Sequence, residues 1–386
     1  MKELIYLDNA STTYPKPEAV YQAMEKAGRN LAVNAGRGFY GLAREAFQLI
    51  EDTREQICRM VHGESVAEAV FTPSATIACN QVLGGLDWKR EAVVYVTPFE
   101  HNAIMRVLAS LQKQYGFEVE ELALNRETMT LDTERIRYQF LRKHPTVLVM
   151  NHVSNVTGTV IPWQEIGKLA ESYHPAVVID GSQALGLVPV RLQNTAADFY
   201  IFAGHKTLYG PLGIGGYVNN HGRRLKPILF GGTGSDSLNL EMDTANVKGY
   251  EPGSMNIAAI AGLYAALMEC GKASEGEWLE KEQNQREYLV KMLARIPEVI
   301  LYPPLSGAVA GILSFNLRGF SAGDVGALLD QEYHIAVRTG YHCAPLIHKY
   351  LNDEGTGGTV RVSIGRFTKE SELERLAEAV EEIAEG

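Results

Sequence analysis

Residues 177–183, which read Val177-Val178-Ile179-Asp180-Gly181-Ser182-Gln183, decide the expected fold, because an acidic residue directly follows an apolar, β-branched run. Other short apolar runs and several helix-like stretches alternate around it: runs at 69–71, 93–96, 146–150, 199–202 and 214–218, and helix-like stretches at 76–86, 103–115 and 164–172. This alternation predicts an α/β fold with a mostly parallel sheet covered on both faces. Ligands of such sheets bind at the carboxyl ends of the strands, where Asp180 would lie.

The pattern changes after about residue 253. One long helical pattern runs from Ile257 to about Arg295, and the remainder predicts a smaller α+β unit with strands near 312–316, 334–338 and 359–364. A charged amphipathic helix over 369–385 ends the chain. We expect a domain boundary near residue 255, unless a continuous helix bridges the two units.

Composition narrows the possible functions. The 386 residues carry 36 Lys and Arg against 46 Asp and Glu, a net charge of −10, which disfavours a general nucleic-acid surface. No apolar run approaches the roughly 20 residues of a membrane span, and the first residues lack the features of a secretory signal. The four cysteines form no CxxC pair, so we expect no zinc site or other metal site, no disulfide framework, and a cytoplasmic protein with reduced thiols.

Asp180 and Lys206 form the first candidate site. Lys206 follows the next apolar run, 198–202, and precedes the glycine-rich segment 210–216. Taken singly, Asp180 is more simply a turn or cap residue and Lys206 a solvated loop lysine. As a pair on neighbouring strand ends they suit pyridoxal phosphate, since the amine forms a Schiff base and the carboxylate keeps the pyridine nitrogen protonated.

Two further elements fit that cofactor. Residues 71–76, Phe-Thr-Pro-Ser-Ala-Thr, run from a strand into a helix and offer hydroxyl and backbone N–H groups to a phosphate, although Ser74 could equally be a simple helix cap. His101 follows another strand and could stack on the pyridine ring or exchange protons, although a single histidine there is more often structural. No P-loop occurs, and the Gly232-Thr233-Gly234 segment lacks the third glycine of a dinucleotide loop.

A possible nucleophile and a possible carboxylate ligand lie near the C-terminus. Cys343 is in a glycine-containing loop next to His342 and after Arg338, and a nearby cation would favour its thiolate. The other three cysteines lie in helix-like apolar surroundings and are expected to be inert. Arg361 lies inside a strand-like run and could pair with a substrate carboxylate, or form an edge-strand salt bridge instead.

With these residues together, the sequence resembles the aminotransferase class V family, and within it the branch of cysteine desulfurases and selenocysteine lyases. The resemblance covers essentially the whole chain and rests on motifs in the same order: Tyr6 to Thr13, Asn151 to Gly158, Asp180 to Gln183, Gly204-His205-Lys206, Glu251 to Ser254 and Arg338 to Ala344. It implies the fold type I of pyridoxal-phosphate-dependent transferases. Such a chain has an N-terminal arm (1–15), a large cofactor-binding domain with a mostly parallel seven-stranded sheet (16–255), and a smaller α+β domain with the Cys343 loop (256–386).

The resemblance also implies a role for each site residue. Lys206 would be the Schiff-base lysine, Asp180 the partner of the pyridine nitrogen, Gln183 the contact of the phenolic oxygen, and His101 the stacking residue. The phosphate would be held by Ala75, Thr76 and His205, and by Ser254 from the other subunit of a homodimer. Asn155 and Arg361 would bind the substrate carboxylate, and Cys343 would accept sulfur as a persulfide.

The implied activity is the pyridoxal-phosphate-dependent conversion of L-cysteine to L-alanine, with the sulfur passed from Cys343 to an unidentified protein acceptor. A selenocysteine lyase, a class V aminotransferase without desulfurase activity, and a non-catalytic scaffold remain alternatives. The chain departs from the family at Ala203, where relatives often have a phosphate-binding serine, and in Ser74-Ala75-Thr76. Its Cys343 loop resembles the short-loop type while residues 363–368 resemble the longer-loop type, which leaves the acceptor open.

Overall fold

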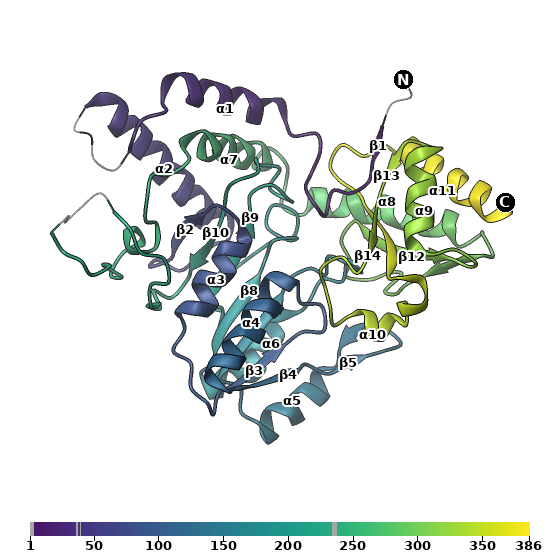
Figure 1. The fold of residues 1–386 in the computed structure, drawn as a ribbon, viewed down its shortest axis with the longest axis horizontal. Coiled ribbons are helices and arrows are strands. Elements are labelled where there is room, and N and C mark those ends of the chain that lie inside the picture. Colours follow the sequence, from purple (N-terminus) through teal and green to yellow (C-terminus); the bar gives the residue numbers. More distant parts are fainter. Residues whose placement is uncertain (1–3, 36–37, 39, 234–237) are drawn as a thin grey trace.

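The computed structural model describes residues 4–35, 38, 40–233 and 238–386. The large unit is built on one seven-stranded sheet (Figure 1). Its strands, in spatial order, are β2 (Glu68–Thr72), β10 (Gly215–Asn219), β9 (Phe199–Ala203), β8 (Ala176–Asp180), β7 (Val147–Asn151), β3 (Val93–Val96) and β4 (Glu118–Glu121). Only β10 runs antiparallel to its neighbours, so the mostly parallel α/β fold is confirmed.

Helices cover both faces of this sheet. Successive strand residues point to opposite faces, and both faces are apolar, which explains why the strands read as continuous hydrophobic runs. Val178 lies in the core beneath α3 (Ala75–Gly85) and α4 (Asn102–Tyr115). Val177 and Ile179 lie in the opposite core, which is covered by helices α2 (Gly41–Met60), α5 (Thr133–Arg142), α6 (Trp163–Ala170) and α7 (Ile257–Cys270).

The prediction of one long helix over 257–295 is wrong. The chain forms α7 and then α8 (Glu277–Leu293), separated by a turn in which Gly276 adopts a left-handed φ of 85°. Helix α7 packs against α1 (Glu18–Asn30) and α2 of the large unit, whereas α8 contacts both units: its Trp278 and Leu279 pack on the cluster of Val153 and Ala184, and its later turns lie in the core of the smaller unit. The division at residue 255 stays a prediction, and the packing of α7 favours a boundary within 271–276.

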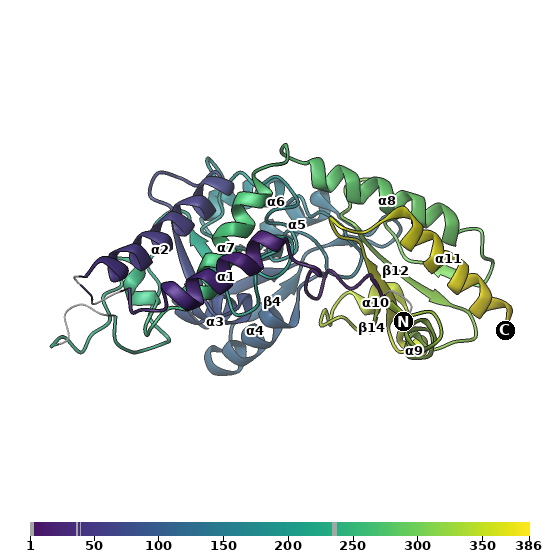
Figure 2. The same ribbon diagram turned by 90° about the horizontal axis from the view of Figure 1, so that it is seen from above.

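The C-terminal unit is a smaller α+β layer. Its antiparallel sheet has the order β11 (Val299–Leu301), β12 (Ile312–Leu317), β15 (Thr359–Ser363) and β14 (Arg338–Gly340). Helices α8, α9 (Ala322–Gln331) and α11 (Glu370–Glu385) pack on it, and Figure 2 shows α8 and α11 side by side along one edge. The strand expected at 334–338 is two short strands, β13 (Ile335–Ala336) and β14, in different sheets.

The N-terminal arm crosses between the units. Its first strand, β1 (Ile5–Tyr6), pairs in parallel with β13 of the smaller unit. The chain then passes along the large unit toward α1 (Figure 2). The remaining short elements are β5 (Leu124–Asn125), β6 (Thr130–Leu131) and α10 (His348–Leu351), with 3-10 turns at Glu171–Tyr173, Val247–Tyr250 and Glu354–Thr356. Among the described residues, no helix is both long and apolar enough to cross a membrane.

Candidate active site

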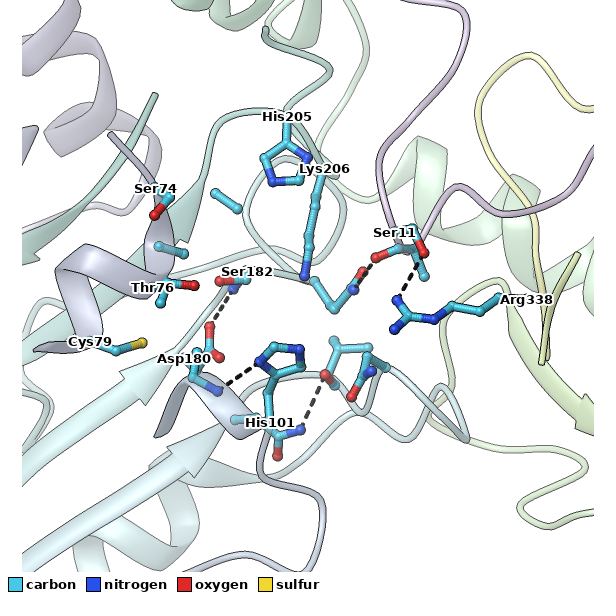
Figure 3. A pocket seen from close by; sticks show the side chains of 18 of the residues that line it. Ser11, Ser74, Thr76, Cys79, His101, Asp180, Ser182, His205, Lys206 and Arg338 are labelled. Atoms are coloured by element: carbon cyan, nitrogen blue, oxygen red, sulfur yellow. Dashed lines mark hydrogen bonds between the residues drawn. The ribbon is translucent and has the colours of Figure 1, made fainter. Parts of the chain in front are cut away.

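A cavity of about 200 Å³ lies at the carboxyl ends of β7 and β8, where the arm and both units meet (Figure 3). Nine of the eleven predicted site residues line it: Ala75, Thr76, His101, Asn155, Asp180, Gln183, His205, Lys206 and Arg361. The cavity is also lined by residues to which the sequence assigned no role in the site or only a minor one: Ser11, Ser74, Cys79, Asn151, Ser182 and Arg338. The cavity therefore brings together residues from nearly the whole length of the chain.

Lys206 and Asp180 face the same cavity from neighbouring strand ends. Asp180 is the last residue of β8 and is buried, and the Ser182 N–H donates to its Oδ1 at 3.0 Å. Lys206 lies in the turn after β9 and extends into the cavity (Figure 3). Burial lowers the pKa of its amine, as do Arg361 and Arg338, while Asp180 opposes them. A lysine with a lowered pKa is more often neutral and thus a better nucleophile.

The N-terminal arm clamps the peptide bond that carries Lys206. The His205 carbonyl accepts from the Thr13 N–H at 3.1 Å, from the Thr12 and Thr13 hydroxyls at 3.1 and 3.2 Å, and from Lys16 Nζ at 2.8 Å. Thr13 also donates to the Lys206 carbonyl at 3.2 Å. The conspicuous threonine pair of the N-terminal motif thus fixes the turn from which the lysine projects.

The start of α3 forms a cup suited to a phosphate. Ser74 does cap α3, since its Oγ accepts from the Ile77 N–H at 3.3 Å, and it also lines the cavity. Gly215 of β10 backs this turn so closely that a Cβ there would lie 2.8 Å from the Ala75 nitrogen. The buried Nδ1 of His205 has no hydrogen-bond partner among the described residues. Free helix N–H groups, a threonine hydroxyl and an unpaired ring nitrogen fit an anion.

His101 is held in one protonation state. It is the N-cap of α4, and its Nδ1 accepts from the Ala103 N–H at 3.0 Å. Burial and the nearby charge of Lys206 together lower the pKa of His101 to about 4. A neutral ring whose Nδ1 accepts a hydrogen bond carries its proton on Nε2, so the Nε2–H of His101 is the hydrogen-bond donor at neutral pH.

Arg361 and Asn155 lie together on the opposite wall. Arg361 is fully buried and donates to Asp8 Oδ1 at 2.6 Å, the Ser11 hydroxyl at 3.0 Å and the Asn155 carbonyl at 3.0 Å. Its Nε has no partner among the described residues. Arg361 is therefore more than an edge-strand ion pair, because β15 lies between β12 and β14 and Arg361 lines the cavity.

Cys343 lies outside the cavity, at its rim. It lines an adjoining, more open cavity of about 620 Å³ together with Arg338, which lines both cavities. Arg338 Nη2 donates to Cys343 Sγ at 3.3 Å. The large unit anchors the loop, since Asn155 Nδ2 donates to the His342 carbonyl at 2.7 Å and the Asn102 N–H donates to the Cys343 carbonyl. The thiol is partly exposed and next to a cation, as expected.

Cys79 and Ser254 line different cavities. Cys79 borders the cavity from α3, a position that the sequence analysis missed, but it is fully buried and burial raises the pKa of its thiol well above the usual value. Its role in the wall is therefore apolar packing. Ser254 does not reach the Lys206 cavity of its own chain and lines a separate cavity of about 300 Å³ with Arg54 and Glu251.

The buried titratable groups give a prediction for the cofactor-free protein. Burial lowers the pKa of His101 and His205 to about 4, of His152 to about 3 and of His342 to about 2. It also raises the pKa of Glu100 and Glu282 to about 8. The ordinary pKa values are 6.5 for histidine and 4.5 for glutamate. At a pH between these two values, unfolding therefore lets the four histidines take up protons and the two carboxylic acids release protons.

We therefore expect the free energy of unfolding to fall as the pH drops from 6.5 to 4.5, by about 1.4 kcal/mol per pH unit for each net proton taken up. Urea unfolding of the cofactor-free protein across this window measures the slope. His152→Gln removes one of the four histidines and should flatten it. Stability that stays constant or increases toward acid would contradict this account.

Fold and site together define an α/β enzyme of the class that binds its ligands at the carboxyl ends of a parallel sheet. The chain belongs to the aminotransferase class-V family, whose model matches residues 5–376. A protein of Methanothermobacter thermautotrophicus named "Probable cysteine desulfurase" is 32% identical over 391 residues, covering 100% of this chain and 96% of the relative. A cysteine desulfurase of Escherichia coli is 32% identical over 390 residues, covering 98% of this chain and 93% of the relative.

Solved structures agree with the sequence relatives. The apo structure of a cysteine desulfurase from Thermococcus onnurineus superposes with a TM-score of 0.90 at 28% identity, covering 99% of this chain and 95% of that chain. A cysteine desulfurase from Escherichia coli superposes with a TM-score of 0.85 at 26% identity, with the same coverage. The family and the fold implied by the motifs are thus confirmed.

Proposed function

We propose that this chain is a pyridoxal-phosphate-dependent cysteine desulfurase that converts L-cysteine to L-alanine and holds the sulfur as a persulfide on Cys343. The observation that carries the proposal is the arrangement of Lys206 and Asp180 in one cavity, with the Cys343 thiol at its rim next to Arg338. Full-length relatives named cysteine desulfurase support it.

The cofactor fits the cavity by the chemistry of its walls. Lys206 would bind its aldehyde, Asp180 its ring nitrogen and Gln183 its phenolic oxygen, while Ala75, Thr76 and His205 would hold the phosphate. Ala203, which replaces a serine often found in relatives, leaves that cup one hydroxyl short. When bound, the cofactor supplies an electron sink for the substrate carbons.

The reaction balances without an oxidant. The bond between Cβ and sulfur of cysteine breaks, and a bond between that sulfur and Cys343 Sγ forms. Cys343 loses its thiol proton, and Cβ gains one proton to become the methyl group of alanine. An external thiol or an acceptor protein then removes the sulfur from Cys343. Cys343 is therefore both the nucleophile and the first sulfur carrier.

The protonation states divide the acid and base roles. The amine of Lys206, with its lowered pKa, is suited to accept the α-proton of the substrate. His101 presents Nε2–H and is suited to donate, because its Nδ1 is occupied by the Ala103 N–H. Arg361 and Asn155, which line the cavity together, would bind the substrate carboxylate.

The proposal is tested by incubating the purified, cofactor-loaded protein with L-cysteine and dithiothreitol and measuring alanine and sulfide together. Equal amounts of the two products are expected. Pyruvate with a pyridoxamine form of the cofactor would instead indicate an aminotransferase, and no Schiff-base absorption band would indicate a scaffold. Selenocysteine lyase is distinguished by comparing kcat/KM for cysteine and selenocysteine.

We further propose a homodimer in which Ser254 of one protomer reaches the phosphate of the other's cofactor. Ser254 lies away from its own Lys206 cavity and is exposed, which supports a role in the partner's site. The sulfur acceptor would be a protein, and the need for a reduced Cys343 favours the cytoplasm.

Complementation tests the shared site. Lys206→Ala and Ser254→Asp are each expected to inactivate the homodimer, the second through charge repulsion of the phosphate. The two variants are mixed in equal amounts, unfolded and refolded together. About a quarter of wild-type activity should return, because half of the dimers then contain one protomer of each variant, and each such dimer has one intact site out of two. No activity in the mixture would contradict the shared site.

A further inference from the structure

Arg338 occupies the wall between two cavities, and this position makes its orientation important. It lines the Lys206 cavity on one side and the open cavity of Cys343 on the other. In Figure 3 its guanidinium points toward Ser11 across the cavity from Cys79 and Thr76. Whatever holds this guanidinium in place also places a positive charge beside the thiol.

The anchoring of Arg338 depends on few contacts. Nη2 donates to Cys343 Sγ at 3.3 Å, and Nη1 donates to Ser11 Oγ at 3.1 Å. In the part of the chain that the structure describes, Arg338 forms no ion pair with a carboxylate. Arg361, by contrast, has Asp8 and the Asn155 carbonyl in addition to Ser11. Loss of Ser11 should therefore loosen Arg338 much more than Arg361.

The Ser11 hydroxyl uses its full hydrogen-bonding capacity. It accepts from Arg338 Nη1 at 3.1 Å and from Arg361 Nη2 at 3.0 Å, and it donates to Asp8 Oδ1 at 2.8 Å. A hydroxyl has one proton and two acceptor lone pairs, so Asp8 fixes the direction of both lone pairs toward the arginines. Ser11 and Arg338 lie 327 positions apart in sequence, joined only by the folded arm.

We propose that Ser11 is a positioning residue that holds Arg338 between the substrate cavity and the Cys343 thiol. Asp8 orients the Ser11 hydroxyl, and that hydroxyl holds Arg338, whose guanidinium donates a hydrogen bond to Cys343 Sγ and keeps a positive charge beside this sulfur. Since Arg361 shares the same hydroxyl, the carboxylate site and the thiol are held at a fixed separation. This inference rests on the proposed function, because it assigns Cys343 the nucleophilic role.

Two measurements on Ser11→Ala test the inference. The first is the rate at which iodoacetamide alkylates Cys343 in the cofactor-free protein, followed by mass spectrometry of the Cys343 peptide. The second is kcat for alanine release and KM for L-cysteine in the cofactor-loaded protein. A hydrogen bond to a charged group is lost, so we expect the alkylation rate and kcat to fall about tenfold. KM should stay within about twofold, since Arg361 keeps its other partners.

A double-mutant cycle separates positioning from general damage. In an Arg338→Met background, Ser11→Ala should change the alkylation rate and kcat by less than about twofold, because the group through which it acts is gone. Ser11→Thr keeps a hydroxyl and should retain most of the activity. Ser321→Ala, which removes the cap of the distant α9, is the matched control and should change neither quantity.

Fully additive effects of Ser11→Ala and Arg338→Met would overturn the inference, as would an unchanged alkylation rate in Ser11→Ala. Ser11→Gly also lacks the hydroxyl and provides the measurement if Ser11→Ala does not fold. If the wild-type protein releases no alanine from cysteine, the proposed function fails, while the alkylation rates still decide whether Ser11 positions Arg338.

Discussion

Lys206→Ala is expected to abolish the release of alanine from L-cysteine, with a loss of at least about 10²–10⁴-fold, the range typical of a residue that moves a proton in the transition state. The loss should be larger than for a proton-transfer residue alone, because Lys206 also provides the covalent link to the cofactor. Borohydride reduction should attach the cofactor to the wild-type protein and leave none on the variant.

The fold should survive this substitution. Burial lowers the pKa of Lys206, which means that its charge is unfavourable in the folded protein, so the cofactor-free variant should unfold at a temperature no lower than the wild type. Lys226→Ala is the matched control, since Lys226 is exposed and its amine pairs with Asp87 at the surface. Substantial turnover by Lys206→Ala, or an equal loss in Lys226→Ala, would contradict the assignment.

Cys343→Ala is expected to leave cofactor binding unchanged and to abolish the formation of persulfide and sulfide from L-cysteine. The thiol lies outside the Lys206 cavity, so its loss removes no wall of the cofactor site. The absorption spectrum of the loaded protein should therefore match the wild type, and L-cysteine should still perturb it. Alanine should fall to background, because no nucleophile remains to take the sulfur.

Cys58→Ala provides the matched control for the thiol. Cys58 is partly buried on α2, where its Sγ contacts the Ala67 carbonyl, and burial raises its pKa to about 11. It should keep wild-type rates of alanine and sulfide release. Full desulfurase turnover by Cys343→Ala would show that the sulfur takes another route.

The sheet could be predicted from sequence because most of its strands are buried on both faces. Such strands are continuous apolar runs, as in 176–179, and the polar residue that ends each run marks the edge where ligands bind. The edge strand β4 was missed because it reads Glu118-Val119-Glu120-Glu121, with two of its glutamates paired to Lys143. An exposed edge needs no apolar run.

The break between α7 and α8 was missed for a different reason. Residues 257–295 contain helix-forming residues almost throughout, and the glycines among them are Gly262, which lies inside α7, Gly271 and Gly276. A glycine inside a helical pattern is a weak signal, since it costs only about 1 kcal/mol relative to alanine. Packing separates the two helices, because α7 lies on α1 and α2 of the large unit while most of α8 packs on β11 and α11 of the smaller one.

Individual residues of the candidate site could be predicted from sequence where a motif contained them. Their hydrogen-bond partners could not. Asp180, Lys206 and Arg361 each follow from their position in or after a strand. The contacts of Ser11 with Arg338 and Arg361 join residues more than 300 positions apart, so no local pattern contains them. The same holds for the arm that clamps the His205 carbonyl.

A single turnover with L-cysteine in the absence of reductant tests the central claim most directly. The cofactor-loaded protein is mixed with one equivalent of L-cysteine per protomer, and alanine and the mass of the Cys343 peptide are measured together. The account predicts one alanine for each peptide that has gained the mass of one sulfur atom. Alanine without added sulfur on Cys343, or added sulfur on Cys58, Cys79 or Cys270 instead, would contradict it.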